Sequence, residues 1–347
     1  MENEVALKIG EPARAAANER TKRIAWIDTA RGVGIILVVV AHAQRGLIKA
    51  GVLPSSPTHM AADATIYAFH MPLFFLLAGL HVAHGIAAGR SAFFKDKLAT
   101  IAWPYFLWSC LHIITVMIVA DVNQPLGLAD LVATPWHPVA QFWFLYALFL
   151  CHLIALALWQ QRWALVALAI LFVAAQAAFG IRNIALHMMQ VFPFFLVGAL
   201  AGPWLIERIR RIPLSNAAIA MAAGWLVLVM SRFAVGWTAD AYPTSSVIFY
   251  LGASAGIIGV MGLSVLLGNG ARWLQRMGQA SMAIFVMHTF FTAGLRFAVY
   301  RAGLPIDPLL LLVASSLLGI VGPWLIYEYA GPRKLTVRLG LGKYVRS

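Results

Sequence analysis

The sequence is poor in charged residues and in cysteine. Only 11% of the 347 residues are charged, whereas about a quarter of the residues of a typical soluble domain are charged. The two cysteines, Cys110 and Cys151, both fall inside apolar runs, where cysteine usually packs as a small hydrophobe. With so few thiols and no HExxH motif, we expect neither a disulfide nor a metal site. The first twenty residues hold no apolar run, so we expect no cleavable signal peptide.

Long apolar runs, by contrast, fill most of the chain, which is 61% hydrophobic. About 20 apolar residues suffice for a helix to cross the hydrocarbon core of a bilayer. About ten stretches approach or exceed this length: Ile24–Ala43, Ala61–Gly85, Leu98–Ala120, Val139–Leu158, Trp163–Phe179, Ala185–Ile206, Ala217–Val235, Ser246–Leu267, Ala280–Val299 and Pro308–Tyr327. Strict alternation of apolar and polar residues is absent, which disfavours a membrane β-barrel. The sequence therefore predicts an all-α, polytopic integral membrane protein with about ten transmembrane helices.

The distribution of positive charge predicts the orientation of the chain. With both termini placed in the cytoplasm, 19 of the 26 lysines and arginines lie in inner segments, six lie in outer loops and Arg31 lies in the membrane. This is the bias expected from the positive-inside rule. We accordingly expect a cytoplasmic tail at 1–22, a ten-helix membrane domain at 23–330 and a cytoplasmic tail at 331–347. The net charge of +13 is dispersed over many loops, which favours contact with anionic lipid headgroups over binding of nucleic acid.

Arg31 and His42 are the most informative polar residues, because both fall inside the first apolar stretch. Eleven residues make about three helical turns, so the two side chains lie on nearly the same face, roughly 16 Å apart along the axis. Asp28 precedes Arg31 by about one turn on that face. Ionisable groups at membrane depth are costly and commonly line a polar interior. We therefore expect Arg31 and His42 to share a water-accessible groove through the helix bundle.

Arg31 has two interpretations. Its side chain could reach back to the lipid headgroups, with Asp28 as a local partner. Alternatively, its guanidinium could bind an anionic ligand such as a phosphate that arrives from the cytoplasm. Lys97, which lies just before the third apolar stretch, would extend such a basic entrance, although an isolated loop lysine is also a simple topology signal.

Three of the ten histidines, His42, His70 and His288, are candidates for acid–base chemistry. A neutral imidazole can accept a proton from a hydroxyl near pH 7. For His70 and His288, interhelical hydrogen bonding is an equally good interpretation, whereas the polar residues on the same face favour a functional role for His42. His81 and His84 are spaced to share one helix face, but no Glu-x-x-His motif on another helix supports a metal site there.

Five segments, taken in order, carry a family resemblance: IDTARGVGIILVVVAHA, FHMPLFFLLAGL, KLATIAWPYFLWS, FWFLYALFL and MGQASMAIFVMH. Together they resemble the acyltransferase-3 family of integral membrane acyltransferases, and more narrowly its fucose 4-O-acetylase-like branch. The resemblance implies transfer of an acyl group, most often acetyl, from acyl-CoA made in the cytoplasm. The implied acceptor is a sugar hydroxyl of an envelope polysaccharide or lipid-linked glycan. Acetyl-CoA would be a donor substrate and not a permanently bound cofactor, and the implied location is the plasma (inner) membrane.

The resemblance also assigns roles to residues. Arg31 and His42 meet the family pattern of an arginine, ten residues and a histidine, which makes His42 the general base and gives Arg31 a role in donor binding or positioning. Many relatives carry two basic residues three apart before the third span. Here Lys97 and Thr100 stand at those positions, so only Lys97 is expected to bind the donor. Whether the acyl group passes directly to the acceptor or through an acyl-histidine stays open at this point.

Trp143 and the overall class of the protein each leave an alternative. The Trp143 ring fits stacking on a sugar or on adenine, but also packing at the membrane interface. The main alternative to an enzyme is a secondary transporter or flippase, which commonly shows two related halves; the sequence shows no such repeat. A non-catalytic membrane protein is disfavoured, because it has no need of two costly intramembrane ionisable groups. The oligomeric state is not predicted.

Overall fold

The computed structural model describes residues 24–119, 125–179, 184–235 and 247–344, and these residues form helices and no strand. The prediction of an all-α fold is confirmed. The tail expected at 1–22 lies outside the described residues. The elements are α2 (Ala25–Lys49), α3 (Pro57–Gly79), α4 (Val82–Ala87), α5 (Arg90–Lys97), η1 (Leu98–Ala102), α6 (Trp103–Ile118), α7 (Leu128–Ala133), η2 (Ala140–Phe142), α8 (Trp143–Leu158), α9 (Arg162–Phe179), α10 (Ile184–Arg210), α11 (Leu214–Val235), α12 (Val247–Leu267), η3 (Gly268–Ala271), α13 (Arg272–Gln279), α14 (Ser281–Arg301) and α15 (Pro308–Ala330).

Each of the ten predicted apolar stretches coincides with a helical region. Nine helical regions of the described chain are long and apolar enough to cross a membrane, whereas the apolar part of α9, Arg162–Ala178, is shorter. The predicted boundaries differ at the third span, which begins at Arg90 instead of Leu98, and at the first span, where α2 continues to Lys49 instead of ending near Ala43. The helix can continue because Arg45 is paired with Asp63 of α3, at 2.7 Å between Nη2 and Oδ2.

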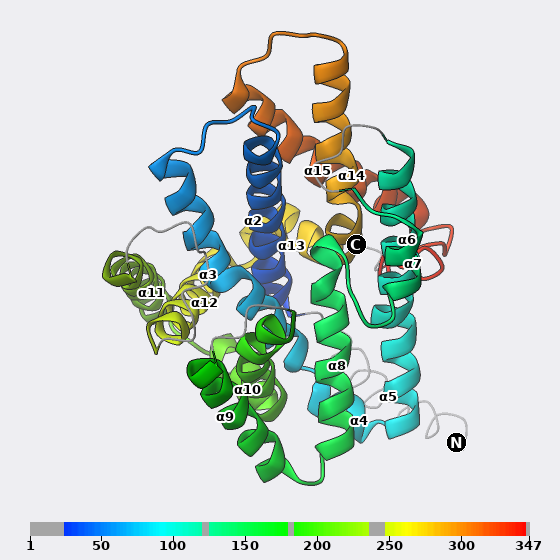
Figure 1. The fold of residues 1–347 in the computed structure, drawn as a ribbon. Helices are drawn as coiled ribbons and strands as arrows, with labels where there is room; N and C mark the ends of the chain where they lie inside the picture. The colour runs from blue at the N-terminus through cyan, green and yellow to red at the C-terminus, as the bar shows by residue number, and fades with distance from the viewer. Residues whose placement is uncertain (1–23, 120–124, 180–183, 236–246, 345–347) are drawn as a thin grey trace, which may run out of the picture.

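Helix α2 runs through the middle of the bundle and contacts α3, α12, α13, α14 and α15 (Figure 1). Small residues allow its closest neighbour, the short helix α13, to cross it tightly. A Cβ atom at Gly278 would overlap the carbonyl oxygen of Asp28, and one at Gly32 would overlap the carbonyl oxygen of Leu274. Helix α13 precedes the ninth span and was not predicted from the sequence. It forms one side of the site described below.

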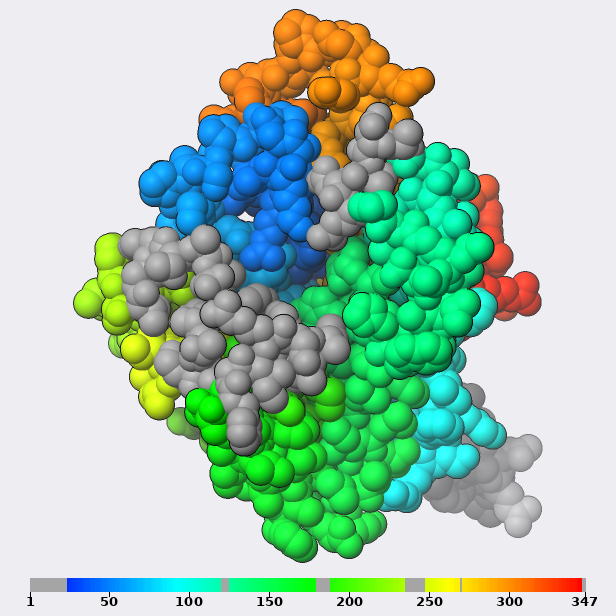
Figure 2. Space-filling model, viewed as in Figure 1, coloured from blue at the N-terminus to red at the C-terminus, as the bar shows by residue number. Residues whose placement is uncertain are grey.

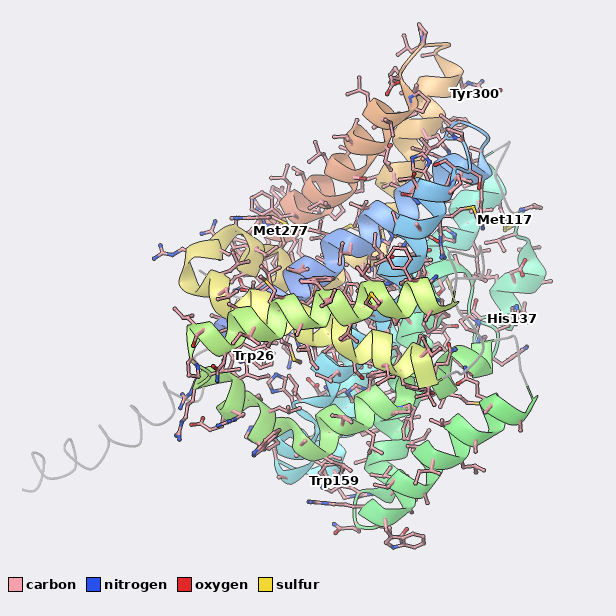
Figure 3. All side chains as sticks on the ribbon, turned by 90° about the vertical axis from the view of Figure 1, so that its left-hand side faces the viewer. Trp26, Met117, His137, Trp159, Met277 and Tyr300 are labelled. Carbon is pink, nitrogen blue, oxygen red and sulfur yellow. The ribbon has the colours of Figure 1, made fainter. Side chains whose placement is uncertain are left out.

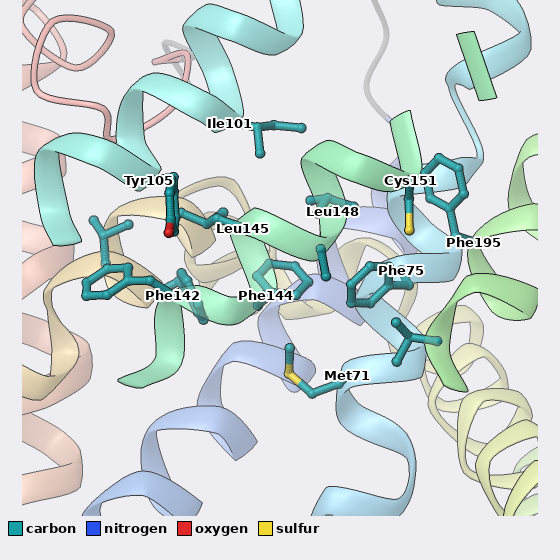
Figure 4. Close-up of a cluster of buried hydrophobic side chains, with 14 of the residues drawn as sticks. Met71, Phe75, Ile101, Tyr105, Phe142, Phe144, Leu145, Leu148, Cys151 and Phe195 are labelled. Atoms are coloured by element: carbon teal, nitrogen blue, oxygen red, sulfur yellow. The ribbon is translucent and has the colours of Figure 1, made fainter. Parts of the chain in front are cut away.

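The largest hydrophobic cluster lies where α8 packs against α3 and the third span (Figure 4). Phe144 of α8 makes an edge-to-face contact with Phe75 of α3, with ring centroids 5.2 Å apart. Leu145, Cys151 and Phe142 are fully buried in the same cluster. Because lipid tails are as apolar as these side chains, such close packing is a main source of helix association in a membrane. Cys110 and Cys151 are both free thiols.

The third span is interrupted by a π-helical segment, η1, between α5 and α6. Pro104 follows two residues after this segment, and its nitrogen carries no hydrogen to donate to the Thr100 carbonyl one turn earlier. The wider π turn accommodates this missing hydrogen bond. Short π segments inside α-helices are rare and are frequent at functional sites, and residues of η1 line a cavity here.

The two ends of the described chain lie at the same end of the bundle, which we call the inner end. Figure 3 shows Trp26 and Met277 toward this end, and Met117 and His137 toward the opposite, outer end. At the outer end the turn between α14 and α15 projects beside the ends of α2 and α3 (Figure 2), where Leu47, Leu53 and Leu311 form a small buried cluster. The inner end is the predicted cytoplasmic end.

The C-terminal segment, residues 331–344, folds back onto the bundle and does not extend away from it (Figure 1). The indole N–H groups of Trp103 and Trp108 in α6 donate to the carbonyl oxygens of Arg338 and Leu339, at 2.9 and 2.8 Å. Leu341 is almost completely buried. The described part of the expected C-terminal tail is therefore an integral part of the inner end.

Candidate active site

A cavity of about 320 Å³ opens among the helices at the inner end. Its lining comes from α2, α3, the third span, α8, α13, α14 and the C-terminal segment. On each of four helical regions, the lining residue nearer the inner end is polar and the one further toward the outer end is apolar. These pairs are Arg31 and Val38, His81 and Met71, Lys97 and Ile101, and Gln279 and Phe285. The cavity, which we call the inner cavity, thus has a polar entrance and an apolar depth.

The entrance of the inner cavity carries a net positive charge. Its lining includes Arg31, Lys97 and Lys343, against a single carboxylate, Asp96. The Asp96 carboxylate forms two ion pairs: one oxygen lies 3.0 Å from Lys97 Nζ, and the other lies 2.8 Å from Lys343 Nζ. Such an arrangement favours an anionic ligand.

Asp28 and Gln279 hold Arg31 at this entrance. A guanidinium nitrogen of Arg31 lies 4.0 Å from Asp28, which is 4% exposed. The Gln279 amide donates to the second oxygen of Asp28 at 3.2 Å. The tight crossing at Gly278 brings this glutamine to the carboxylate, so α13 orients the ion pair that the sequence predicted within α2.

A second cavity, of about 160 Å³, lies toward the outer end, and we call it the outer cavity. Its polar lining residues are His42, Thr289, Thr292, Arg296 and Ser315. The Nδ1 atom of His42 lies 2.9 Å from the Val38 carbonyl oxygen. Because a carbonyl oxygen can only accept, Nδ1 carries the proton and Nε2 of the neutral ring has a free lone pair. This is the tautomer that a base working through Nε2 requires.

The structure brings the three candidate histidines into one aromatic cluster. The rings of His42 and His288 meet edge-on with centroids 5.0 Å apart. His70 joins through Tyr67, whose ring lies 4.6 Å from His70 and 6.1 Å from His42. His70 and His288 are fully buried and bond through Nδ1 to carbonyl oxygens one turn earlier. Their Nε2 atoms have no hydrogen-bond partner among the described residues.

Arg45 covers the outer side of this cluster. Its guanidinium carbon lies 3.2 Å from the centre of the Tyr67 ring, a cation–π contact. Its Nε and Nη2 atoms donate to the two carboxylate oxygens of Asp63. Arg45, one of the six basic residues predicted to lie in outer loops, is therefore part of the packed wall around the histidines.

Arg31 and His42 line two different cavities, not the single groove that the sequence suggested. The two cavities approach each other along α2 and α14. Val38 lines the inner cavity and His42, one helical turn further, lines the outer one; Phe285 and Thr289 repeat this relation on α14. Only about one turn of two helices, with His288 buried in it, separates the two spaces along these faces.

The site also contains residues that the sequence did not indicate. Trp143, in contrast, lies outside it. Trp143 is half-buried against the main hydrophobic cluster and is not part of the lining of either cavity. The sequence did not indicate four of the lining residues: Asp96 and Lys343 at the entrance, and Thr289 and Arg296 in the outer cavity. To predict them one must know which helices pack side by side, and a single sequence does not give this. Among the described residues, no group of three or more His, Cys, Asp or Glu is placed to hold a metal ion.

These features define a multi-pass membrane protein with an ionisable site at mid-depth. Residues 24–328 match the family model of the acyltransferase domain. The chain belongs to this family, the acyltransferase-3 family. The predicted family is confirmed, while the fucose 4-O-acetylase-like branch stays a prediction.

The chain is also similar to the nodulation protein NolL of Sinorhizobium fredii, with 27% identity over 243 residues. The similar region is 67% of this chain and 62% of that protein, so the chain spans less than two thirds of the length of this relative. No solved structure matches the chain.

Proposed function

We propose that the protein is an O-acetyltransferase of the plasma (inner) membrane. It moves an acetyl group from cytoplasmic acetyl-CoA to a sugar hydroxyl of an envelope polysaccharide or lipid-linked glycan. The observation that supports this best is the placement of His42 in the outer cavity, one helical turn from the apolar depth of a cationic inner cavity. A donor and an acceptor can approach this turn from opposite ends of the bundle.

The inner cavity fits the donor in charge and in polarity. Coenzyme A carries phosphates at one end and an uncharged arm that ends in the thioester. Arg31 and Lys97 at the entrance suit the phosphates, since a guanidinium and an ammonium both bind such anions well. The apolar depth near Val38 and Phe285 suits the arm and excludes water around the reacting carbon.

The outer cavity fits an acceptor that carries hydroxyl groups. Thr289 is positioned by Gln141, whose amide donates to its hydroxyl oxygen at 2.9 Å. Arg296 of α14 donates to the Gly46 carbonyl oxygen of α2 and so bridges the two helices at the cavity. These groups and Thr292 offer hydrogen bonds to a polar ligand beside the His42 ring.

The chemistry assigned to His42 is general-base catalysis. Its unprotonated Nε2 takes the proton of the acceptor hydroxyl as the oxygen attacks the thioester carbonyl carbon. The tetrahedral intermediate collapses with cleavage of the carbon–sulfur bond, and the imidazolium returns the proton to the leaving thiolate. Direct transfer needs no acyl-enzyme. His70 and His288 have a supporting role: His288 packs against the His42 ring and His70 packs against Tyr67, so that the buried cluster holds the His42 ring in place.

Replacement of His42 tests this proposal. We expect His42→Ala to lower the transfer of radiolabelled acetyl groups from acetyl-CoA to an envelope glycan extract by about 100-fold to 10,000-fold, the usual contribution of a general base. Binding of acetyl-CoA by the purified variant should be unchanged, because His42 does not line the inner cavity. His112→Ala is the matched control, since His112 is an intramembrane histidine outside the lining of both cavities. Transfer by His42→Ala at the rate of this control would exclude His42 as the base.

A further inference from the structure

The C-terminal segment, residues 331–344, lies beyond the part of the chain that matches the acyltransferase family, 24–328. It nevertheless forms part of the inner cavity, which is lined by Gly342 and Lys343. A segment outside the matched domain thus contributes a positive charge to the entrance of a cavity that the domain itself builds.

The segment is held in place by contacts with α6 and α15. Besides the two indole hydrogen bonds to its backbone, the Tyr327 hydroxyl donates to the Lys343 carbonyl oxygen at 3.0 Å. The Tyr344 hydroxyl donates to Glu328 at 3.2 Å. Thr336 and Leu341 are buried, at 2% and 1% exposed. These contacts fix the backbone on both sides of Lys343.

Two glycines direct Lys343 toward the cavity. Gly340 and Gly342 have φ values of 64° and 87°, in the left-handed region that other residues adopt rarely. The chain turns at both positions, so that Leu341 points into the protein while Lys343 faces Asp96.

At the entrance, one carboxylate holds two ammonium groups. Lys97 and Lys343 bind different oxygens of Asp96, which brings two like charges close together at a repulsive cost. The Lys343 side chain is 67% exposed and that of Lys97 is 21% exposed. Lys343 is therefore open to a ligand, and an added anion would offset the local excess of positive charge.

We propose that Lys343 is a donor-binding residue and that the C-terminal segment completes the binding site for the phosphates of the acyl-CoA donor. This proposal rests on the proposed function only for the identity of the donor. A lysine binds phosphate as a compact point charge, and Lys343 places one beside Lys97 without a contact to the reacting carbon. The segment acts on donor affinity and has no part in the proton transfer at His42.

Binding of coenzyme A alone to the purified full-length protein tests the proposal. We expect Lys343→Gln to weaken the affinity, measured by isothermal titration calorimetry, by about tenfold, which corresponds to one charged contact of roughly 1.4 kcal/mol. Arg338→Gln, which removes a positive charge of the same segment outside the cavity lining, should change the affinity less than about twofold. Lys343→Gln with wild-type affinity would overturn the proposal.

A double variant separates direct contact from charge balance. Asp96→Asn combined with Lys343→Gln removes one charge of each sign, so the net charge of the entrance equals that of the wild type. Direct contact predicts that the affinity for coenzyme A stays reduced. Recovery to the wild-type value would mean that Lys343 only neutralises Asp96, and the proposal would be wrong.

Failure of the proposed function gives a different result. If the wild type does not bind coenzyme A at all, both proposals are excluded. If the wild type binds and Lys343→Gln binds equally well, only the role of Lys343 is lost. Leu341→Asp serves as a second variant: displacement of the segment from its buried site should weaken binding as Lys343→Gln does, with His42-dependent transfer still measurable at saturating donor.

Discussion

At the scale of single residues, the two ionisable groups of α2 have different tasks in the proposed function. Arg31 faces the inner cavity with Asp28 as its counter-ion, and His42 faces the outer one with Nδ1 fixed by Val38. Binding and chemistry should therefore respond separately to substitution.

Arg31 should affect donor binding more than turnover. We expect Arg31→Gln to raise the KM for acetyl-CoA by about tenfold or more, since a hydrogen bond to a charged group contributes about 1.5–3 kcal/mol, and to lower kcat much less. The KM of Arg31→Lys for acetyl-CoA should lie between those of the wild type and Arg31→Gln, because an ammonium keeps the charge but lacks the two-pronged geometry of a guanidinium. Arg210→Gln is the control, as this exposed arginine at the inner end pairs with Glu207 away from the cavity. A large loss of kcat with an unchanged KM would assign Arg31 to the chemistry instead.

The sequence was sufficient to single out Arg31 and His42, because a helix of fixed pitch determines which of its own residues share a face. It could not predict that His288 contacts His42, or that Gln141 contacts Thr289, since these pairs lie 148 or more positions apart. Lys343 was missed for the same reason, because its partner Asp96 is 247 positions away.

At the scale of elements, the tight crossing of α13 and α2 supports the entrance of the inner cavity. Gly278 lies against the backbone of Asp28, and the adjacent Gln279 holds the carboxylate that pairs with Arg31. A side chain at this crossing should push the two helices apart.

We expect Gly278→Ala to lower the stability by about 1–3 kcal/mol, the usual cost of overpacking, and to reduce acetyl transfer as Gln279 moves. Thermal unfolding in detergent measures the first effect. Gly294→Ala is the matched control, because no atom lies within 4 Å of a Cβ added there and alanine is the better helix former. Equal stability of the two variants would show that the crossing is not tight.

Hydropathy predicted the apolar helices, nine of which are long enough in the described chain to cross a membrane, because the bilayer sets their length and composition. It gave wrong limits for α2, where hydrogen bonding continues beyond the apolar residues to Lys49. The helix α13 and the π segment η1 were not predicted, since α13 is short and amphipathic and η1 differs from an α-helix only in its hydrogen-bond register.

At the scale of the whole molecule, two cavities reach the middle of one bundle from opposite ends. The excess of positive charge in the predicted inner segments would place the inner cavity on the cytoplasmic side, where acyl-CoA is made. The C-terminal segment, predicted only as a tail, closes one side of that cavity through long-range hydrogen bonds that no local pattern signals.

If donor and acceptor meet at His42 from opposite sides of the membrane, transfer in sealed vesicles of defined orientation depends on the side that holds acetyl-CoA. With the glycan acceptor on the outer side, we expect radiolabelled acetyl groups to reach it when acetyl-CoA is supplied on the cytoplasmic side and not when acetyl-CoA is supplied outside. Equal labelling from an outer supply of acetyl-CoA in intact vesicles would contradict the account.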